Sequence, residues 1–304
     1  MVATGAKDRT QARPVDPGEV VYPGAMSPGP LELNRRNWDD RARVHGQDRV
    51  YDSEALVSGA GSLAAAELDG LRRAVGSVAN LDVIHLQCHI GFDSIRLARM
   101  GARVTGLDFS RVALAKAARL ALRSRVELRL VEADVCAPPA TLFGHFDLAY
   151  ATIGVLCWIS DIGAWMRAVE HLLRPGGSLL LVEIHPFPGM VETIDPLRLD
   201  FPYGFDGPHR FDSAGTYTDR DAVIEATTTV QYAHSLGEVV TAAVESGLEV
   251  RWLEERTESS RDHRGDLPGP DPDGRYRMRL GGQPVPLEYT LIADKPGGIV
   301  PPGP

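Results

Sequence analysis

The segment LDVIHLQCHIGFDSIRLARMGARVTGLDFS, from Leu81 to Ser110, decides the fold. Its first apolar run is short enough for a buried strand, and the polar letters QCHIG form a turn. Apolar residues at helical spacing follow as far as Gly101, a residue that commonly ends helices. A second short strand then ends at Asp108. This order is half of a nucleotide-binding α/β unit, in which backbone N–H groups of the turn and the strand-end carboxylate face the ligand.

Strand and helix patterns continue to alternate after this segment. Ser110 and Asp161 are good N-cap residues for two further helices. Because strand–helix repeats build parallel sheets with right-handed crossovers, we expect an α/β fold with a Rossmann-like, seven-stranded, mostly parallel sheet and helices on both faces. The other strands are expected over 126–131, 146–151, 178–184, 248–254 and 287–293.

The segments around this core differ in composition. Pro and Gly are frequent at the N-terminus, two charged or amphipathic helices follow, and an aromatic and Pro-rich stretch with later β-branched alternation comes directly after the fifth strand. A polar loop over 259–286 is expected at the surface. The predicted parts are an extended N-terminal arm (1–30), a helical cap (31–79), the core (80–186 and 235–295), an inserted antiparallel lid (187–234) and a tail (296–304).

Composition excludes several classes of function. The chain has 304 residues, a formal net charge of −9 and no run of Lys or Arg, so a nucleic-acid or anionic-membrane surface is not expected. No apolar run approaches the roughly 20 residues of a membrane span. The three cysteines have no paired spacing, which indicates reduced thiols and a cytoplasmic protein. The histidines are scattered and no CxxC pair occurs, so no metal site is predicted.

Several motifs in order carry a resemblance to a known family. They are the turn QCHIG, in which Gly91 keeps the last glycine of a GxGxG pattern, the strand-end Asp108, Asp134 after the third strand, and the turn LRPGG after a helix. Together they resemble the class I S-adenosylmethionine-dependent methyltransferases, over about residues 80–186 by motif and 235–294 by element order. The segments NWDDRARVH, HLQCHIGFDS and VEIHPF are similar to those of small bacterial methyltransferases that act on small molecules.

The resemblance implies S-adenosyl-L-methionine as the cofactor and assigns residues to it. Asp108 would accept hydrogen bonds from the ribose hydroxyls, Phe109 would lie against the adenine, and Asp134 would lie near the adenine amino group. His89 occupies a glycine position of the family turn, where its side chain would contact cofactor or substrate. The expected cofactor-binding residues are Gln87, His89, Gly91, Asp108, Phe109, Asp134, Val135 and Thr152.

Residues for the acceptor side follow from strand ends and aromatic side chains. His185, directly after the fifth strand, is the candidate catalytic base, with a pocket-lining role as the alternative. Glu183 lies on the same strand face and could orient it. Aromatic faces suit a sulfonium through cation–π attraction. The expected substrate-pocket residues are Trp38, Tyr51, Trp158 and His234.

The predicted function is methyl transfer to an O or N nucleophile of a small molecule, and the expected acceptor is a specialised metabolite. The expected partners are that small-molecule substrate and, because of the N-terminal arm, a second copy in a homodimer. A nicotinamide-dependent oxidoreductase is one alternative, although the glycines of GxGxxG are absent. A non-catalytic scaffold that binds the nucleoside, or one that uses it for another reaction, is the other alternative.

Overall fold

A seven-stranded sheet forms the centre of the protein. The computed structural model describes residues 28–48 and 50–297. The strand order is β10-β13-β5-β4-β1-β2-β3, and β13 runs antiparallel to both of its neighbours. The predicted Rossmann-like, mostly parallel sheet is therefore confirmed. The strands are β1 (Asp82–Leu86), β2 (Arg103–Asp108), β3 (Arg129–Glu132), β4 (Phe146–Thr152), β5 (Leu173–Ile184), β10 (Glu249–Arg256) and β13 (Glu288–Asp294).

Helices cover both faces of the sheet. Trp165 of α6 and Val239 of α8 pack in one apolar cluster, whereas Leu71 of α3 and Leu97 of α4 pack in the cluster on the other face. Side chains alternate along a strand, so Ile84 of β1 joins the first cluster and Val83 joins the second. The helices are α1 (Pro30–Val44), α2 (Ser53–Ser58), α3 (Ala65–Val75), α4 (Phe92–Arg99), α5 (Arg111–Arg123), α6 (Ile162–Leu172), α7 (Pro186–Met190) and α8 (Leu236–Glu245).

The predicted helix boundaries depend on caps that the structure contains. Ser110 accepts a hydrogen bond from the backbone N–H of Ala113, and Asp161 accepts one from Ala164, so each satisfies a free donor at a helix start. Gly101 has φ +92° just after α4, a left-handed conformation that favours glycine. These local signals are why the helix positions follow from sequence.

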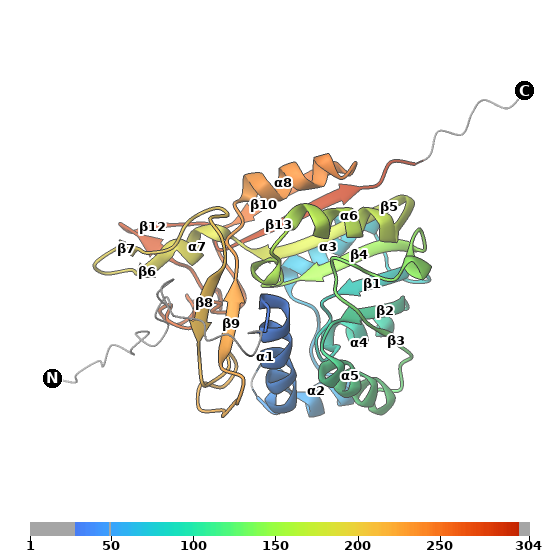
Figure 1. Ribbon diagram of the computed structural model, residues 1–304, viewed down its shortest axis with the longest axis horizontal. Coiled ribbons are helices and arrows are strands. Elements are labelled where there is room, and N and C mark those ends of the chain that lie inside the picture. The colour runs from blue at the N-terminus through green and yellow to red at the C-terminus, as the bar shows by residue number, and fades with distance from the viewer. Residues whose placement is uncertain (1–27, 49, 298–304) are drawn as a thin grey trace, which may run out of the picture.

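The segment between β5 and α8 folds as small antiparallel hairpins, as predicted. Figure 1 shows α1 standing between the β8–β9 hairpin and α5. Asn34 of α1 donates to the carbonyl of Val230 and accepts from its N–H, both at 2.7 Å. These bonds join the N-terminal helix to the lid. The small strands are β6 (Val191–Thr193), β7 (Arg198–Leu199), β8 (His209–Asp212), β9 (Thr228–Gln231), β11 (Arg279–Leu280) and β12 (Gln283–Pro284).

Some details differ from the sequence predictions. The third strand begins at Arg129, because pairing with β2 starts at Thr105↔Arg129. A third, short helix, α2, lies between the two helices expected in the cap, and Asp52 caps it. The loop predicted over 259–286 contains the β11–β12 hairpin. The predicted arm over 1–30 lies outside the described residues except at its end, and so does the tail from residue 298 onward.

Candidate functional site

The turn after β1 holds two non-glycine residues in a left-handed conformation. Gln87 has φ +53° and His89 has φ +49°, values that side chains with a Cβ seldom adopt. The Gln87 side chain compensates by donating to the carbonyl of Val155 at 3.0 Å and accepting from the Trp165 indole at 3.1 Å. Gln87 therefore ties the end of β1 to the loop after β4 and to α6.

The His89 ring lies under the N-terminal helix. Its centroid is 5.0 Å from that of Trp38 in an edge-on arrangement, and its Nε2 is 2.9 Å from Nδ1 of His45. Burial holds the pKa of His89 well below its usual value and lowers the pKa of His45 to about 4. Both rings are therefore neutral near pH 7. The histidine pair itself therefore adds no charge where α1 covers the turn.

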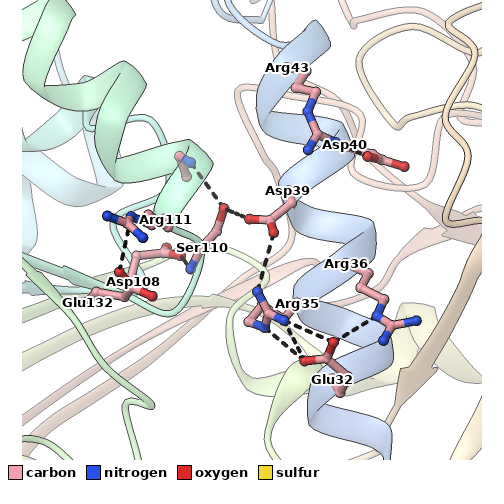
Figure 2. Close-up of polar contacts among 11 residues, drawn as sticks. Glu32, Arg35, Arg36, Asp39, Asp40, Arg43, Asp108, Ser110, Arg111 and Glu132 are labelled. Atoms are coloured by element: carbon pink, nitrogen blue, oxygen red, sulfur yellow. Dashed lines mark hydrogen bonds and ion pairs between the residues drawn. The ribbon is translucent and has the colours of Figure 1, made fainter. Parts of the chain in front are cut away.

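Asp108 ends β2 next to this turn and is only 5% exposed. One carboxylate oxygen accepts from the backbone N–H of His89 at 2.8 Å and the other accepts from that of Ser110 at 2.8 Å. Burial raises the pKa of Asp108 to about 6. In Figure 2, Ser110 also reaches α1, where its hydroxyl donates to Asp39 at 2.6 Å.

A cavity of about 100 Å³ lies at these strand ends. The predicted residues that line it are Trp38, Tyr51, Gln87, His89, Gly91, Asp108, Phe109, Thr152 and Trp158. Two predicted cofactor residues lie outside this lining. Asp134 accepts from the backbone N–H of Cys136 at 3.0 Å, and Val135 is buried in the core. Tyr217, which the sequence did not single out, closes the cavity by a 2.7 Å contact between its hydroxyl and that of Tyr51.

A larger cavity of about 510 Å³ adjoins the first, and Gly154 lines both. Its wall includes the aromatic side chains of Phe201, Tyr203, Phe211 and Tyr289. Two predicted residues, His185 and His234, line this second cavity rather than the first. The loop expected at the surface lines it as well, through Arg261, His263, Arg264 and Leu267. Neither Gly/Pro content nor polarity could reveal that role, because it depends on how the loop folds back against α7 and β6.

Glu183 fixes the backbone at the junction of the two cavities. This carboxylate is 4% exposed and accepts backbone N–H groups of Gly154, Val155, Leu156 and Ile184. Burial raises its pKa, although the four donors favour the ionised form. The side chain thus holds the loop after β4, and no hydrogen bond joins it to His185 among the described residues.

The two histidines of the larger cavity have different hydrogen bonds. In His185, Nδ1 accepts from the backbone N–H of Phe187 at 3.1 Å, and Nε2 lies 2.8 Å from Glu255. Burial lowers the pKa of His185, although the Glu255 contact opposes this. In His234, Nε2 lies 2.6 Å from the carbonyl of Ile159, while Nδ1 is buried with no hydrogen-bond partner among the described residues.

Within residues 28–48 and 50–297, no three His, Cys, Asp or Glu side chains are arranged to hold a metal ion. None of the helices described there has the length and apolar character needed to cross a membrane.

Comparison with known proteins gives a consistent result. Residues 84–179 match the family described as "Methyltransferase domain". The chain is 30% identical over 131 residues to the ubiquinone biosynthesis O-methyltransferase of Cronobacter sakazakii, covering 43% of this chain and 54% of that protein. It is 35% identical over 112 residues to that of Xanthomonas oryzae pv. oryzae, covering 36% and 46%. The chain thus spans about half the length of the curated relatives it matches.

Solved structures share the fold at lower identity. A crystal structure of an S-adenosylmethionine-dependent methyltransferase from Mesorhizobium loti has a TM-score of 0.52 at 22% identity, covering 76% of this chain and 98% of that one. A structure of the cyclase SpnF has a TM-score of 0.53 at 17% identity, covering 90% and 98%. At these identities the likeness concerns the fold alone.

Proposed function

We propose, from the match of residues 84–179 to a methyltransferase domain, that the protein is a class I enzyme that transfers a methyl group from S-adenosylmethionine to a small molecule. The observation that carries the proposal is the pair of cavities that meet at Gly154. One contains the strand-end carboxylate of Asp108, and the other is an aromatic cavity under the lid. Ligands of open α/β sheets bind at this edge, outside the carboxyl ends of the strands.

The residues of the smaller cavity fit the nucleoside part of the donor. Asp108 has a buried carboxylate whose remaining lone pairs can accept the two ribose hydroxyls, and Phe109 follows it with an aromatic face for adenine. The start of α4 has no side-chain cap, so its first N–H groups are available to a carboxylate. Asp134 and Val135, which lie outside the cavity lining, remain proposed neighbours of the adenine.

The smaller cavity has to widen for the whole donor. Ligand sites usually enclose about 300–1,000 Å³, whereas this cavity has about 100 Å³ and the rings of Trp38, Tyr51 and Tyr217 line it. Trp38 belongs to α1 and Tyr217 to the lid, which are joined through Asn34. We therefore propose that these rings move outward together when the donor enters, and close again over it.

The bound donor supplies an activated methyl group, so the protein mainly has to position two reactants and exclude water. Glu183 holds the loop at which the cavities meet. His185 uses both ring nitrogens for structure, which favours a positioning role at the start of α7 over proton transfer. Trp158 and His234 are proposed to bound the acceptor. We also still predict that the acceptor is a specialised metabolite, that the protein is cytoplasmic and that it forms a homodimer.

The test is methyl transfer itself. Full-length protein is incubated with S-adenosylmethionine carrying a labelled methyl group and with fractionated small-molecule extract, and labelled products are separated by chromatography. The proposal expects a product that the Asp108→Ala variant fails to form. If no labelled product forms above the level without enzyme, the proposed activity is rejected.

A further inference from the structure

Arg41 of α1 is a cation enclosed by aromatic rings. The residue is 8% exposed. Its guanidinium carbon lies 5.2 Å from the ring centre of Trp38, 5.8 Å from that of Trp158 and 5.7 Å from that of Tyr217. Such contacts stabilise a cation, and more strongly when it is desolvated. They do not neutralise its charge.

No carboxylate pairs with Arg41 in the part of the chain that the structure describes. Its only hydrogen bond there runs from Nε to the side-chain oxygen of Asn37 at 2.6 Å. The two nearby acids of α1 are engaged elsewhere. Asp39 accepts from Ser110, and Asp40 accepts backbone N–H groups of the lid. Burial lowers the pKa of Arg41, which indicates that the charge is held at a cost.

Arg41 itself lines neither cavity, and its charge lies behind the rings at their junction. All three rings around it, Trp38, Trp158 and Tyr217, line the smaller cavity, and Cys157, next to Trp158, lines the larger one. The Trp158 indole donates to the carbonyl of Gly154 at 2.9 Å, and Gly154 lines both cavities. The neighbouring rings of His45 and His89 are neutral near pH 7 and do not compensate the charge.

We propose that Arg41 is an anion-binding residue that pairs with a carboxylate or an ionised hydroxyl of a ligand at this junction. Removal of the guanidinium would leave that ligand anion without a partner, since a planar guanidinium is well suited to carboxylates. The inference rests on the proposed function and deepens it. The anion has two possible sources, the methionine carboxylate of the donor or an acceptor that reacts in its ionised form.

The experiment compares Arg41→Met and Arg41→Lys with wild type, and uses Arg36→Met as the matched control. Arg36 lies on the same helix, and its side chain is 57% exposed. Calorimetry measures binding of S-adenosylhomocysteine and of 5′-methylthioadenosine, which lacks the amino-acid part. Absorbance measures how far 4-nitrophenol is ionised at fixed pH when it is bound to protein saturated with S-adenosylhomocysteine. Binding of 5′-methylthioadenosine to Arg41→Met also shows that the nucleoside site is still folded.

If the donor supplies the anion, Arg41→Met weakens the binding of S-adenosylhomocysteine at least about tenfold and leaves the binding of 5′-methylthioadenosine unchanged. Arg41→Lys then recovers part of the lost affinity. If the acceptor supplies it, both nucleosides bind as in wild type, and the ionised fraction of 4-nitrophenol falls in Arg41→Met alone. The inference is overturned if Arg41→Met changes neither the binding of S-adenosylhomocysteine nor the ionised fraction of 4-nitrophenol. It is also overturned if Arg41→Met weakens the binding of both nucleosides equally. Failure of wild type to bind either nucleoside would instead reject the proposed function.

Discussion

The backbone N–H of His89 donates to the carboxylate of Asp108 at 2.8 Å. This bond fixes the turn after β1 against the end of β2, and it lets a turn with few glycines keep the shape that a nucleoside site needs. Ser110 donates its backbone N–H to the other oxygen of the same carboxylate. Asp108 is therefore a structural acceptor and a proposed ribose ligand at once, and the two roles can be separated by pH.

The stability of the free protein should depend on the ionisation of Asp108. Its pKa rises from 3.8 to about 6 on folding because it is buried. A raised folded-state pKa stabilises the protein below pH 3.8, and the contribution is lost as pH rises through 6. The shift corresponds to on the order of 3 kcal/mol. Urea unfolding should therefore show wild type losing stability relative to Asp108→Asn between about pH 4 and 7. A pH-independent difference would contradict this.

The affinity for the cofactor should also depend on the ionisation of Asp108, but it should increase with pH where the stability of the free protein decreases. The ribose hydroxyls need an ionised acceptor, so binding of S-adenosylhomocysteine should strengthen as pH rises through about 6 and then level off. Asp108→Asn should bind more weakly at pH 7 and lack this dependence. Calorimetric titrations from pH 5 to 8 measure both. Equal affinities of the two proteins at pH 7 would remove Asp108 from the ribose site.

Glu183→Gln should destabilise the fold. A glutamine offers one oxygen and one N–H₂ group where four backbone N–H groups need acceptors, so buried donors lose their partners. The expected loss is about 2–4 kcal/mol of unfolding free energy in urea. Glu245→Gln, at an exposed position of α8, is the control and should change stability by less than about 0.5 kcal/mol. If Glu183→Gln is as stable as this control, the four hydrogen bonds to the Glu183 carboxylate contribute little to the stability of the fold.

His185 can be tested by a substitution that preserves its cap. Asn is a good N-cap residue and can accept from the N–H of Phe187 as His185 does. If His185 only positions α7, His185→Asn keeps turnover of the acceptor found in the labelled-methyl experiment within roughly tenfold of wild type. His185→Ala, which lacks a cap, loses stability. If His185 is instead a general base, both substitutions remove it and lower the turnover rate by about 10²–10⁴. Turnover and melting temperature of the two variants decide between these roles.

Asn34→Ala should loosen the lid while the core stays folded. Both hydrogen bonds to Val230 disappear, and the buried N–H and carbonyl of that residue are left without partners. Each unsatisfied group costs about 1–3 kcal/mol. Hydrogen exchange measured by mass spectrometry should accelerate over β8 and β9 and remain unchanged in β4. If exchange of the β8–β9 hairpin does not change, the hydrogen bonds from Asn34 do not hold the lid against α1.

The sequence predicted the elements whose signals are local. The caps Ser110 and Asp161, the glycine that ends α4 and the apolar runs of the strands depend on near neighbours only. Strand ends such as Asp108 and Thr152 followed from the rule that a parallel sheet brings them to one edge. The family resemblance supplied the kind of cofactor.

The remaining features depend on contacts between distant segments. Tyr217 and Arg261 come from the lid and from a polar loop, and their approach to the cavities depends on how these segments fold back. Glu183 lies in β5 two residues before His185, yet its side chain turns to the loop after β4, because four backbone donors are nearer partners for a buried carboxylate. Burial of Arg41 depends on three rings from three segments, which no spacing in the sequence encodes.

The sheet edge beside Asp108 is proposed to bind the methyl donor rather than a nicotinamide dinucleotide. Calorimetric titration of the full-length protein with S-adenosylhomocysteine and, separately, with NADH tests this most directly. We expect saturable binding of S-adenosylhomocysteine that Asp108→Ala weakens, with no heat of binding from NADH. Binding of NADH without binding of S-adenosylhomocysteine would contradict it.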